Sequence, residues 1–211
     1  MSTITPTKAT GISAVSAPEP AHAVSEMIDA TETLYRFTVK EYEQIAGFLD
    51  DDRVELIDGY LVKKLTKNPP HVVGCARALA AIARLAPGGW FARPGEPVRI
   101  KRRTEPEPDV SLARGTLKDY ANRHPEPSDI AMVVEVADTT LAKDRRRRRI
   151  YGPAGIPIYW IVNLVGRHVE VYTEPTSEGY ASRTDYAAGA HIPLVIDGVT
   201  VGQIAVADIL P

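Results

Sequence analysis

The first regular pattern of apolar positions along the chain begins near Thr38. The apolar residues that follow lie on one face of a helix, and Thr38 with Glu41 three residues later matches a capping box. This pattern predicts a helix over residues 38–49. Residues 54–62 then place Asp58-Gly59 between two apolar segments, which is the strongest short signal for a β-hairpin.

The rest of the chain alternates between helical and extended patterns. Residues 71–85 predict a helix that Pro87-Gly88-Gly89 ends, and Asp138-Thr139-Thr140 is expected to cap a helix running to about Tyr151. The pattern predicts strands over 97–101, 108–113, 130–137, 158–165, 168–172, 194–196 and 200–201.

This order of elements indicates an α/β fold in which helices pack against a central mixed sheet. Residues 1–33 are rich in Ser, Thr, Ala and Pro and show little periodicity, so they predict a disordered N-terminal tail. We therefore expect one domain over residues 34–211.

Composition narrows the class of protein. The apolar fraction of 44% is ordinary for a globular domain, and the single cysteine, Cys75, excludes an intramolecular disulfide. The sequence has no apolar run of eighteen residues and no basic-then-apolar leader, so we expect neither a membrane span nor a secretory signal. A cytoplasmic protein is the default expectation.

Basic residues are clustered although the net charge is only −2. One cluster contains Arg99, Lys101, Arg102 and Arg103, and a second contains Lys143 and the run Arg145 to Arg149. Charge runs are most often solvated faces, and this reading stays open. The clusters flank the two carboxylates described next, which favours contact with nucleic-acid phosphates.

Glu135 interrupts the strongly apolar strand 130–137. Strand alternation places Glu135 on one face with Val133 and Ala137, opposite Met132, Val134 and Val136. A buried carboxylate must be paired, protonated or bound to a metal. A core ion pair with an arginine and a functional role are about equally compatible with this residue alone.

Asp109 favours the functional role. It follows Pro108 at the start of the strand over 108–113, and alternation places it on the same face as Ser111. If the two strands are neighbours, Asp109 and Glu135 can converge on one hard cation such as Mg²⁺, which prefers oxygen ligands. Such an ion polarises a phosphoryl oxygen and supplies hydroxide near neutral pH.

Five sequence elements in this order resemble the putative restriction endonuclease family of the PD-(D/E)XK superfamily. They are Arg53 to Gly59, Pro70-His71, Glu107-Pro108-Asp109-Val110, Val133 to Val136, and Tyr151 followed by Ala154 to Val162. The resemblance extends from about Phe37 to the C-terminus. It implies a restriction-endonuclease-like fold, Mg²⁺- or Mn²⁺-dependent hydrolysis of DNA, and often a homodimer.

The resemblance also implies residue roles. Asp109 and Glu135 would bind the metal, with the Val136 carbonyl and Glu55 as further ligands. The superfamily pattern has a lysine two residues after the second acid, where this chain has Ala137. Members of the family instead place a lysine on the following helix. The matching position is Arg148 by spacing from Glu135, with an uncertainty of one residue, and Lys143 is the only lysine on that helix.

Arginine holds phosphate well but does not accept a proton, so the missing lysine bears directly on catalysis. His71 follows two prolines, as in the family. It would contact phosphate or lie near the metal, although a capping or surface role is the commoner one for such a histidine. The basic residues expected to bind DNA, together with His71, are Arg99, Lys101, Arg102, Arg103, Arg145, Arg146 and Arg149.

Three functions follow from these observations. The first is a metal-dependent DNA endonuclease in which Asp109 and Glu135 bind the ion and Lys143 or Arg148 orients the water or the scissile phosphate. The second is a nuclease-fold module that binds nucleic acid or a protein without cleavage. The third is a small-molecule or protein-interaction domain in which Glu135 is only a core ion pair.

Overall fold

A computed structural model describes residues 34–49, 54–64 and 66–211 of the chain. The tail predicted over residues 1–33 lies outside the described residues. Residues 36–211 form one compact unit, and everything below concerns this unit. None of its described helices is long and apolar enough to cross a lipid bilayer.

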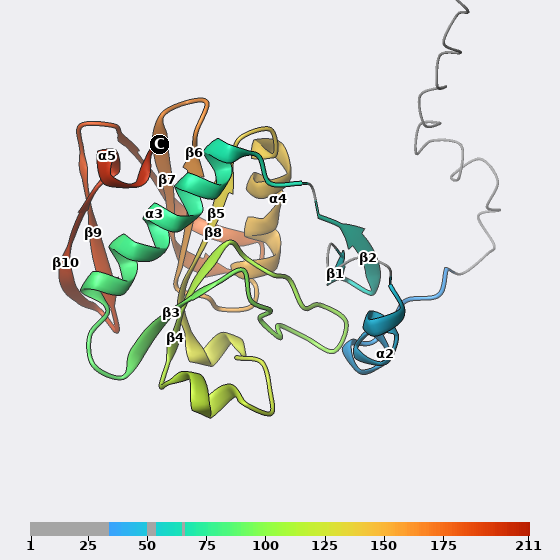
Figure 1. Cartoon of the computed structure of the whole chain (residues 1–211). Helices are drawn as coiled ribbons and strands as arrows, with labels where there is room; N and C mark the ends of the chain where they lie inside the picture. The colour runs from blue at the N-terminus through green and yellow to red at the C-terminus, as the bar shows by residue number, and fades with distance from the viewer. Residues whose placement is uncertain (1–33, 50–53, 65) are drawn as a thin grey trace, which may run out of the picture. The chain divides into compact units, whose positions relative to one another are not determined.

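A mixed sheet forms the centre of the fold (Figure 1). Its six strands lie in chain order and are β3 (Trp90–Pro94), β4 (Val110–Arg114), β5 (Ile130–Ala137), β6 (Ile158–Asn163), β7 (His168–Thr176) and β8 (Gly179–Ala187). Strands β5 and β6 are parallel, and all other neighbours are antiparallel. The parallel pair requires a crossover connection, which is helix α4 (Leu141–Tyr151).

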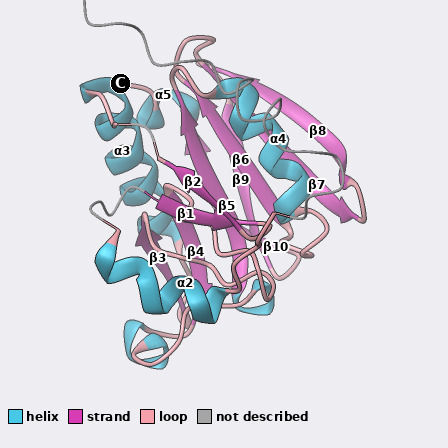
Figure 2. Ribbon diagram, turned by 90° about the vertical axis from the view of Figure 1, so that its right-hand side faces the viewer, coloured by secondary structure: helices cyan, strands magenta, loops and turns pink. Residues whose placement is uncertain are grey.

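The two faces of the sheet pack against different elements (Figure 2). One face packs against α3 (Pro69–Leu85), the short helix α5 (Val206–Ile209) and the hairpin of β9 (His191–Ile196) and β10 (Val199–Ala205). The other face packs against α4. Because both faces are covered, every residue of the central strand β5 is buried. The expected alternation is confirmed: Val134 contributes to the first core and Val133 to the second.

The early segment forms the elements that its pattern predicts. Helix α2 (Val39–Ile45) begins after Thr38, whose side chain and Glu41 make the expected capping box, and a 3-10 turn, η1 (Ala46–Phe48), continues it. Strands β1 (Val54–Ile57) and β2 (Tyr60–Lys63) form the expected hairpin. Asp58 and Gly59 both have positive φ, at 51° and 85°, as a type I′ turn requires.

The strand predicted over 97–101 is not formed, and this prediction was wrong. Pro97 at its start lacks the N–H group that a ladder needs. The segment instead folds back on itself, with hydrogen bonds from Val98 to Pro106 and from Ile100 to Thr104. The sheet's edge is β3, which the pattern did not predict. Two 3-10 turns, η2 (Leu117–Tyr120) and η3 (Pro127–Asp129), connect β4 to β5.

Helix α4 packs closely on β8 at one backbone contact, which gives a test of the fold. A Cβ added to Gly152, at the end of α4, would overlap the backbone of Gly179 at the start of β8. We expect Gly152→Ala to lower the free energy of unfolding by about 1–3 kcal/mol, the usual cost of overpacking. Gly189→Ala is the matched control, because nothing lies within 4 Å of its added Cβ. Equal thermal unfolding of both variants would contradict the packing.

Candidate metal and nucleic-acid site

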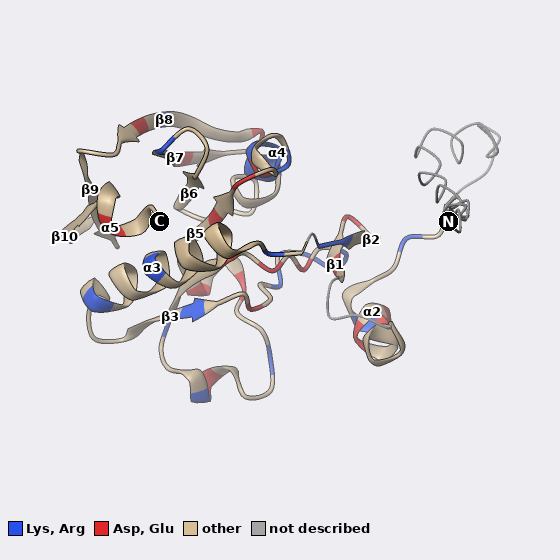
Figure 3. Ribbon diagram, turned by 45° about the horizontal axis from the view of Figure 1, so that its top comes forward, with Lys and Arg blue, Asp and Glu red and all other residues tan. Residues whose placement is uncertain are grey.

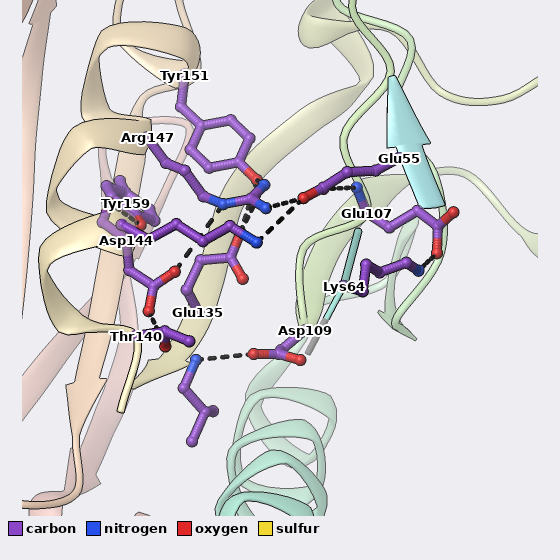
Figure 4. Close-up of polar contacts among 12 residues, drawn as sticks. Glu55, Lys64, Glu107, Asp109, Glu135, Thr140, Asp144, Arg147, Tyr151 and Tyr159 are labelled. Atoms are coloured by element: carbon purple, nitrogen blue, oxygen red, sulfur yellow. Dashed lines mark hydrogen bonds and ion pairs between the residues drawn. The ribbon is translucent and has the colours of Figure 1, made fainter. Parts of the chain in front are cut away.

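Strand register brings Asp109 and Glu135 together. Strands β4 and β5 are antiparallel with Val110 opposite Val134. Continuing this register by one residue places Asp109 opposite Glu135. Asp109 Oδ2 accepts a hydrogen bond from the Val136 backbone N–H at 2.9 Å, which fixes the carboxylate against β5 (Figure 4). Both carboxylates line one pocket.

Asp109 is held by basic groups around its carboxylate. His71 Nε2 lies 3.2 Å from its Oδ2, and Lys67 Nζ lies 3.0 Å from its Oδ1. Burial raises the pKa of Asp109, but the hydrogen bond and charge of His71, the charge of Lys67 and the Val136 N–H outweigh burial. The pKa is therefore lowered to about 2, and Asp109 is ionised at neutral pH.

Glu135 lies in a less polar environment. Its Oε1 accepts a hydrogen bond from the Tyr151 hydroxyl at 2.8 Å and lies 3.5 Å from Arg147 Nη1. Burial raises the pKa of Glu135 to about 8, even though the charge of Arg147 opposes the shift. Within the described residues, no hydrogen bond or ion pair uses Oε2. Glu135 therefore carries a proton at neutral pH until a cation replaces it.

Arg147 is the buried cation of the site. It contacts Glu55, which is fully buried, and Glu135, and its Nε lies 3.9 Å from Asp144 Oδ1 (Figure 4). Asp144, Arg147 and Tyr151 share the buried side of α4 because residues three and four apart lie on one helix face. Burial alone would lower the pKa of Arg147. The negative charge around it has the larger effect and raises the pKa, so the guanidinium stays charged.

The residues present fit a hard divalent cation. The pocket lined by Asp109 and Glu135 also contains Val136, so two carboxylates and a main-chain carbonyl are available as oxygen ligands. Carboxylate Oε2 of Glu135 is the donor atom with no other contact among the described residues. Lys67 is about half exposed and can move away from Asp109 when an ion binds.

Comparisons with known proteins agree with this fold. A family model described as Uma2, putative restriction endonuclease, matches residues 39–204. The chain belongs to this family. A solved structure described as a putative nuclease belonging to DUF820, from Anabaena variabilis ATCC 29413, matches with a TM-score of 0.62 and 13% identity. The match covers 82% of this chain and 97% of that one. No curated protein matches.

Membership of the Uma2 family confirms the resemblance seen in the sequence. At 13% identity the solved structure shows the fold alone, and it agrees with the predicted mixed sheet flanked by helices. The family supports a nuclease in the broad sense.

The arginine predicted for the family's helix position and its neighbour on α4 lie in different surroundings. Arg148 is exposed and does not line the pocket, whereas its neighbour Arg147 is buried in it. Spacing from Glu135 gave Arg148, within one residue, and the rotation of α4 turns Arg147 toward the pocket. Asp144 on the same helix is also buried and lines the pocket.

Three other predicted site residues are Glu55, Lys143 and His71, and each has different contacts in the structure. Glu55, predicted as a metal ligand, does not line the pocket. Its Oε1 pairs with Arg147 and lies 3.4 Å from Lys143 Nζ, and its Oε2 lies 3.4 Å from the Glu107 N–H. Lys143 does line the pocket. His71 contacts Asp109, so a capping or surface role does not describe it.

Lys143 and Arg147 of the second cluster line this pocket, and the other members of the two clusters do not. Arg99 pairs with Glu43 and Glu105, while Lys101 and Arg102 are exposed and Arg103 is partly exposed. Arg145 pairs with Glu170. Basic residues gather on α4 (Figure 3). Several of them line a groove together with residues of β7 and β8. The groove is lined by Arg145, Arg146, Arg148, Arg149, Tyr172, Tyr180, Ala181, Ser182 and Arg183. DNA binding by these clusters stays a prediction.

Sequence reasoning missed three polar residues of the site. Lys64, Lys67 and Cys75 come from the segment between the β1–β2 hairpin and α3 and from the first turns of α3. Lys64 and Lys67 line the pocket, and Cys75 Sγ lies 3.3 Å from His71 Nδ1. The four-residue spacing of His71 and Cys75 was the one available signal, since it puts both on one helix face.

The raised pKa of Glu135 predicts a pH-dependent stability. Protonated Glu135 stabilises the fold fully below its ordinary pKa of 4.5, and this contribution is lost as pH rises through about 8. Each unit of pKa difference is worth about 1.4 kcal/mol. We expect wild type to lose unfolding free energy relative to Glu135→Gln between pH 5 and 8, measured by denaturant titration. A pH-independent difference would refute the assignment.

Arg147 and Arg148 offer a matched pair of substitutions. Arg147→Met leaves buried carboxylates without their cation, so we expect a loss of about 3–5 kcal/mol in unfolding free energy. Arg148→Met removes an exposed side chain next to it on α4, and we expect a change within about 0.5 kcal/mol. Chemical denaturation measures both. Similar losses in the two variants would show that Arg147 is not the buried cation.

Proposed function

We propose that this chain is a divalent-metal-dependent endonuclease that hydrolyses phosphodiester bonds in DNA. The supporting observation is the pair Asp109 and Glu135, opposite each other in strand register and lining one pocket with lysines. Membership of the Uma2 family supports a nuclease. The metal and the DNA substrate are the finer parts of the proposal.

In this proposal Asp109, Glu135 and the Val136 carbonyl hold Mg²⁺ or Mn²⁺. A bound ion of this kind polarises a phosphoryl oxygen and lowers the pKa of its water. The two carboxylates differ in charge before an ion binds, because Asp109 is ionised and Glu135 carries a proton. An ion bound here would therefore displace the Glu135 proton, and the Tyr151 hydroxyl and Arg147 would keep its carboxylate oriented.

The substrate phosphate would meet basic side chains at the pocket. Lys143 lines it and is about one-third exposed, so its ammonium group can donate hydrogen bonds to a scissile phosphate. Arg147 stabilises negative charge but cannot take a proton. We assign Lys143 to orienting the phosphate or the attacking water, and Arg147 to positioning Glu135. Arg145, Arg146 and Arg149 on α4, and Arg99 to Arg103, would hold the DNA backbone. A homodimer stays a prediction.

Plasmid cleavage tests the proposal. Purified full-length protein is incubated with supercoiled DNA and Mg²⁺ or Mn²⁺, and nicking is followed on gels. We expect Asp109→Asn and Glu135→Gln each to reduce cleavage at least about a hundredfold, since metal catalysis contributes several kcal/mol. Asp208→Asn, an exposed carboxylate on α5, is the control expected to retain activity.

The same experiment separates the competing functions. Binding of DNA by wild type without cleavage, measured by fluorescence anisotropy, would favour a nuclease-fold module that has lost catalysis. Ala137 in place of the motif lysine is the observation that favours this second function. Absence of cleavage, DNA binding and divalent-ion binding would leave Glu135 as a core ion pair with Arg147.

A further inference from the structure

The first turns of α3 present a second set of metal-binding atoms beside the pocket. One ligand atom each from His71, Cys75 and Asp109 lies within 4.8 Å of the others. Cys75 Sγ lies 3.3 Å from His71 Nδ1, and His71 Nε2 lies 3.2 Å from Asp109 Oδ2. The proposed Mg²⁺ site, in contrast, uses only oxygen atoms. The two sets share Asp109.

The chemistry of the three donors differs from that of a magnesium site. Sulfur, imidazole nitrogen and carboxylate oxygen are the ligands of Zn²⁺, whereas Mg²⁺ takes oxygen ligands. Three protein ligands with water in the fourth position is the coordination found in catalytic zinc sites. We propose that His71, Cys75 and Asp109 bind a thiophilic divalent ion such as Zn²⁺, and that this binding and Mg²⁺ binding exclude each other.

Local structure supports a preformed set. His71 and Cys75 are four residues apart on α3, so their side chains project from the same helix face. The helix start is fixed by Asn68, whose side chain accepts the His71 backbone N–H at 3.0 Å. The three ligand atoms already lie within 4.8 Å of one another, and His71 would use one of its two ring nitrogens. Lys67, about half exposed, must leave Asp109 when the ion arrives.

Mutual exclusion follows from the shared carboxylate. In the Mg²⁺ site Asp109 would act together with Glu135 of β5, against which its carboxylate is fixed. In the zinc site it would act together with His71 and Cys75 of α3. One carboxylate can bridge two ions, but the same oxygen faces both sites here: Asp109 Oδ2 accepts the Val136 N–H and lies 3.2 Å from His71 Nε2. Zinc would therefore inhibit DNA cleavage by removing Asp109 from the hard-ion site. This inhibitory role rests on the proposed function, whereas zinc binding itself does not.

Cadmium absorption tests the binding without using DNA. Cys75 is the only cysteine of the chain, so any cadmium–thiolate charge-transfer band reports on this residue alone. Titration of wild type with Cd²⁺ should give the band with a single equivalent, and Zn²⁺ should displace it. Cys75→Ser should abolish the band. His71→Ala and Asp109→Asn should each weaken Cd²⁺ affinity at least about tenfold. Circular dichroism of each variant checks folding.

Two results would overturn the proposal. The first is no band in folded wild type. The second is a band with unchanged affinity in both His71→Ala and Asp109→Asn, which would mean that the thiol binds alone.

Inhibition is tested separately on active protein. Cys75→Ser should keep Mg²⁺-dependent cleavage and lose inhibition by Zn²⁺, whereas equal inhibition of wild type and Cys75→Ser would overturn mutual exclusion. A protein that shows the cadmium band but never cleaves DNA would contradict the proposed function and leave the zinc site supported.

Discussion

Carboxylates from three separate parts of the chain meet the buried guanidinium of Arg147. Glu55 comes from the β1–β2 hairpin, Glu135 from the central strand and Asp144 from α4 itself. Removing such charges from water costs several kcal/mol each unless they are paired. The pairing therefore constrains the hairpin, the sheet and α4 to one arrangement. Any movement of α4 would leave at least one buried carboxylate without a counter-charge.

The same arrangement gives the two central acids different charge states, one ionised and one neutral. Asp109 lies at the start of β4 among a histidine, a lysine and a main-chain N–H, and these hold its pKa low. Glu135 lies one strand away in the apolar middle of the sheet, and burial holds its pKa high. The site thus carries less negative charge before an ion binds than two free carboxylates would. The lower charge keeps the fold stable without a metal ion, while both carboxylates remain available to bind one.

Membership of the Uma2 family and the likeness to a solved nuclease fold agree with this picture at the level of fold and broad activity. The local chemistry departs from the superfamily pattern in two ways. Ala137 occupies the place of the motif lysine, and the helix supplies Arg147 beside Glu135. Lys64 and Lys67, which precede α3, and Lys143 on α4 line the pocket in its place. The pocket therefore keeps its positive charge, which comes from residues other than the one at the motif position.

The sequence by itself determined the elements whose patterns are local: the capped helix at Thr38, the Asp58-Gly59 hairpin and the alternation that singles out Glu135. It also pointed to Asp109 as its partner. Only the tertiary structure decided that Arg147 and not Arg148 enters the site, that Glu55 neutralises a guanidinium, and that His71 reaches Asp109. The physical reason is that a periodic pattern gives the face of an element, whereas charge pairing depends on strand register and helix rotation, which packing between distant segments sets.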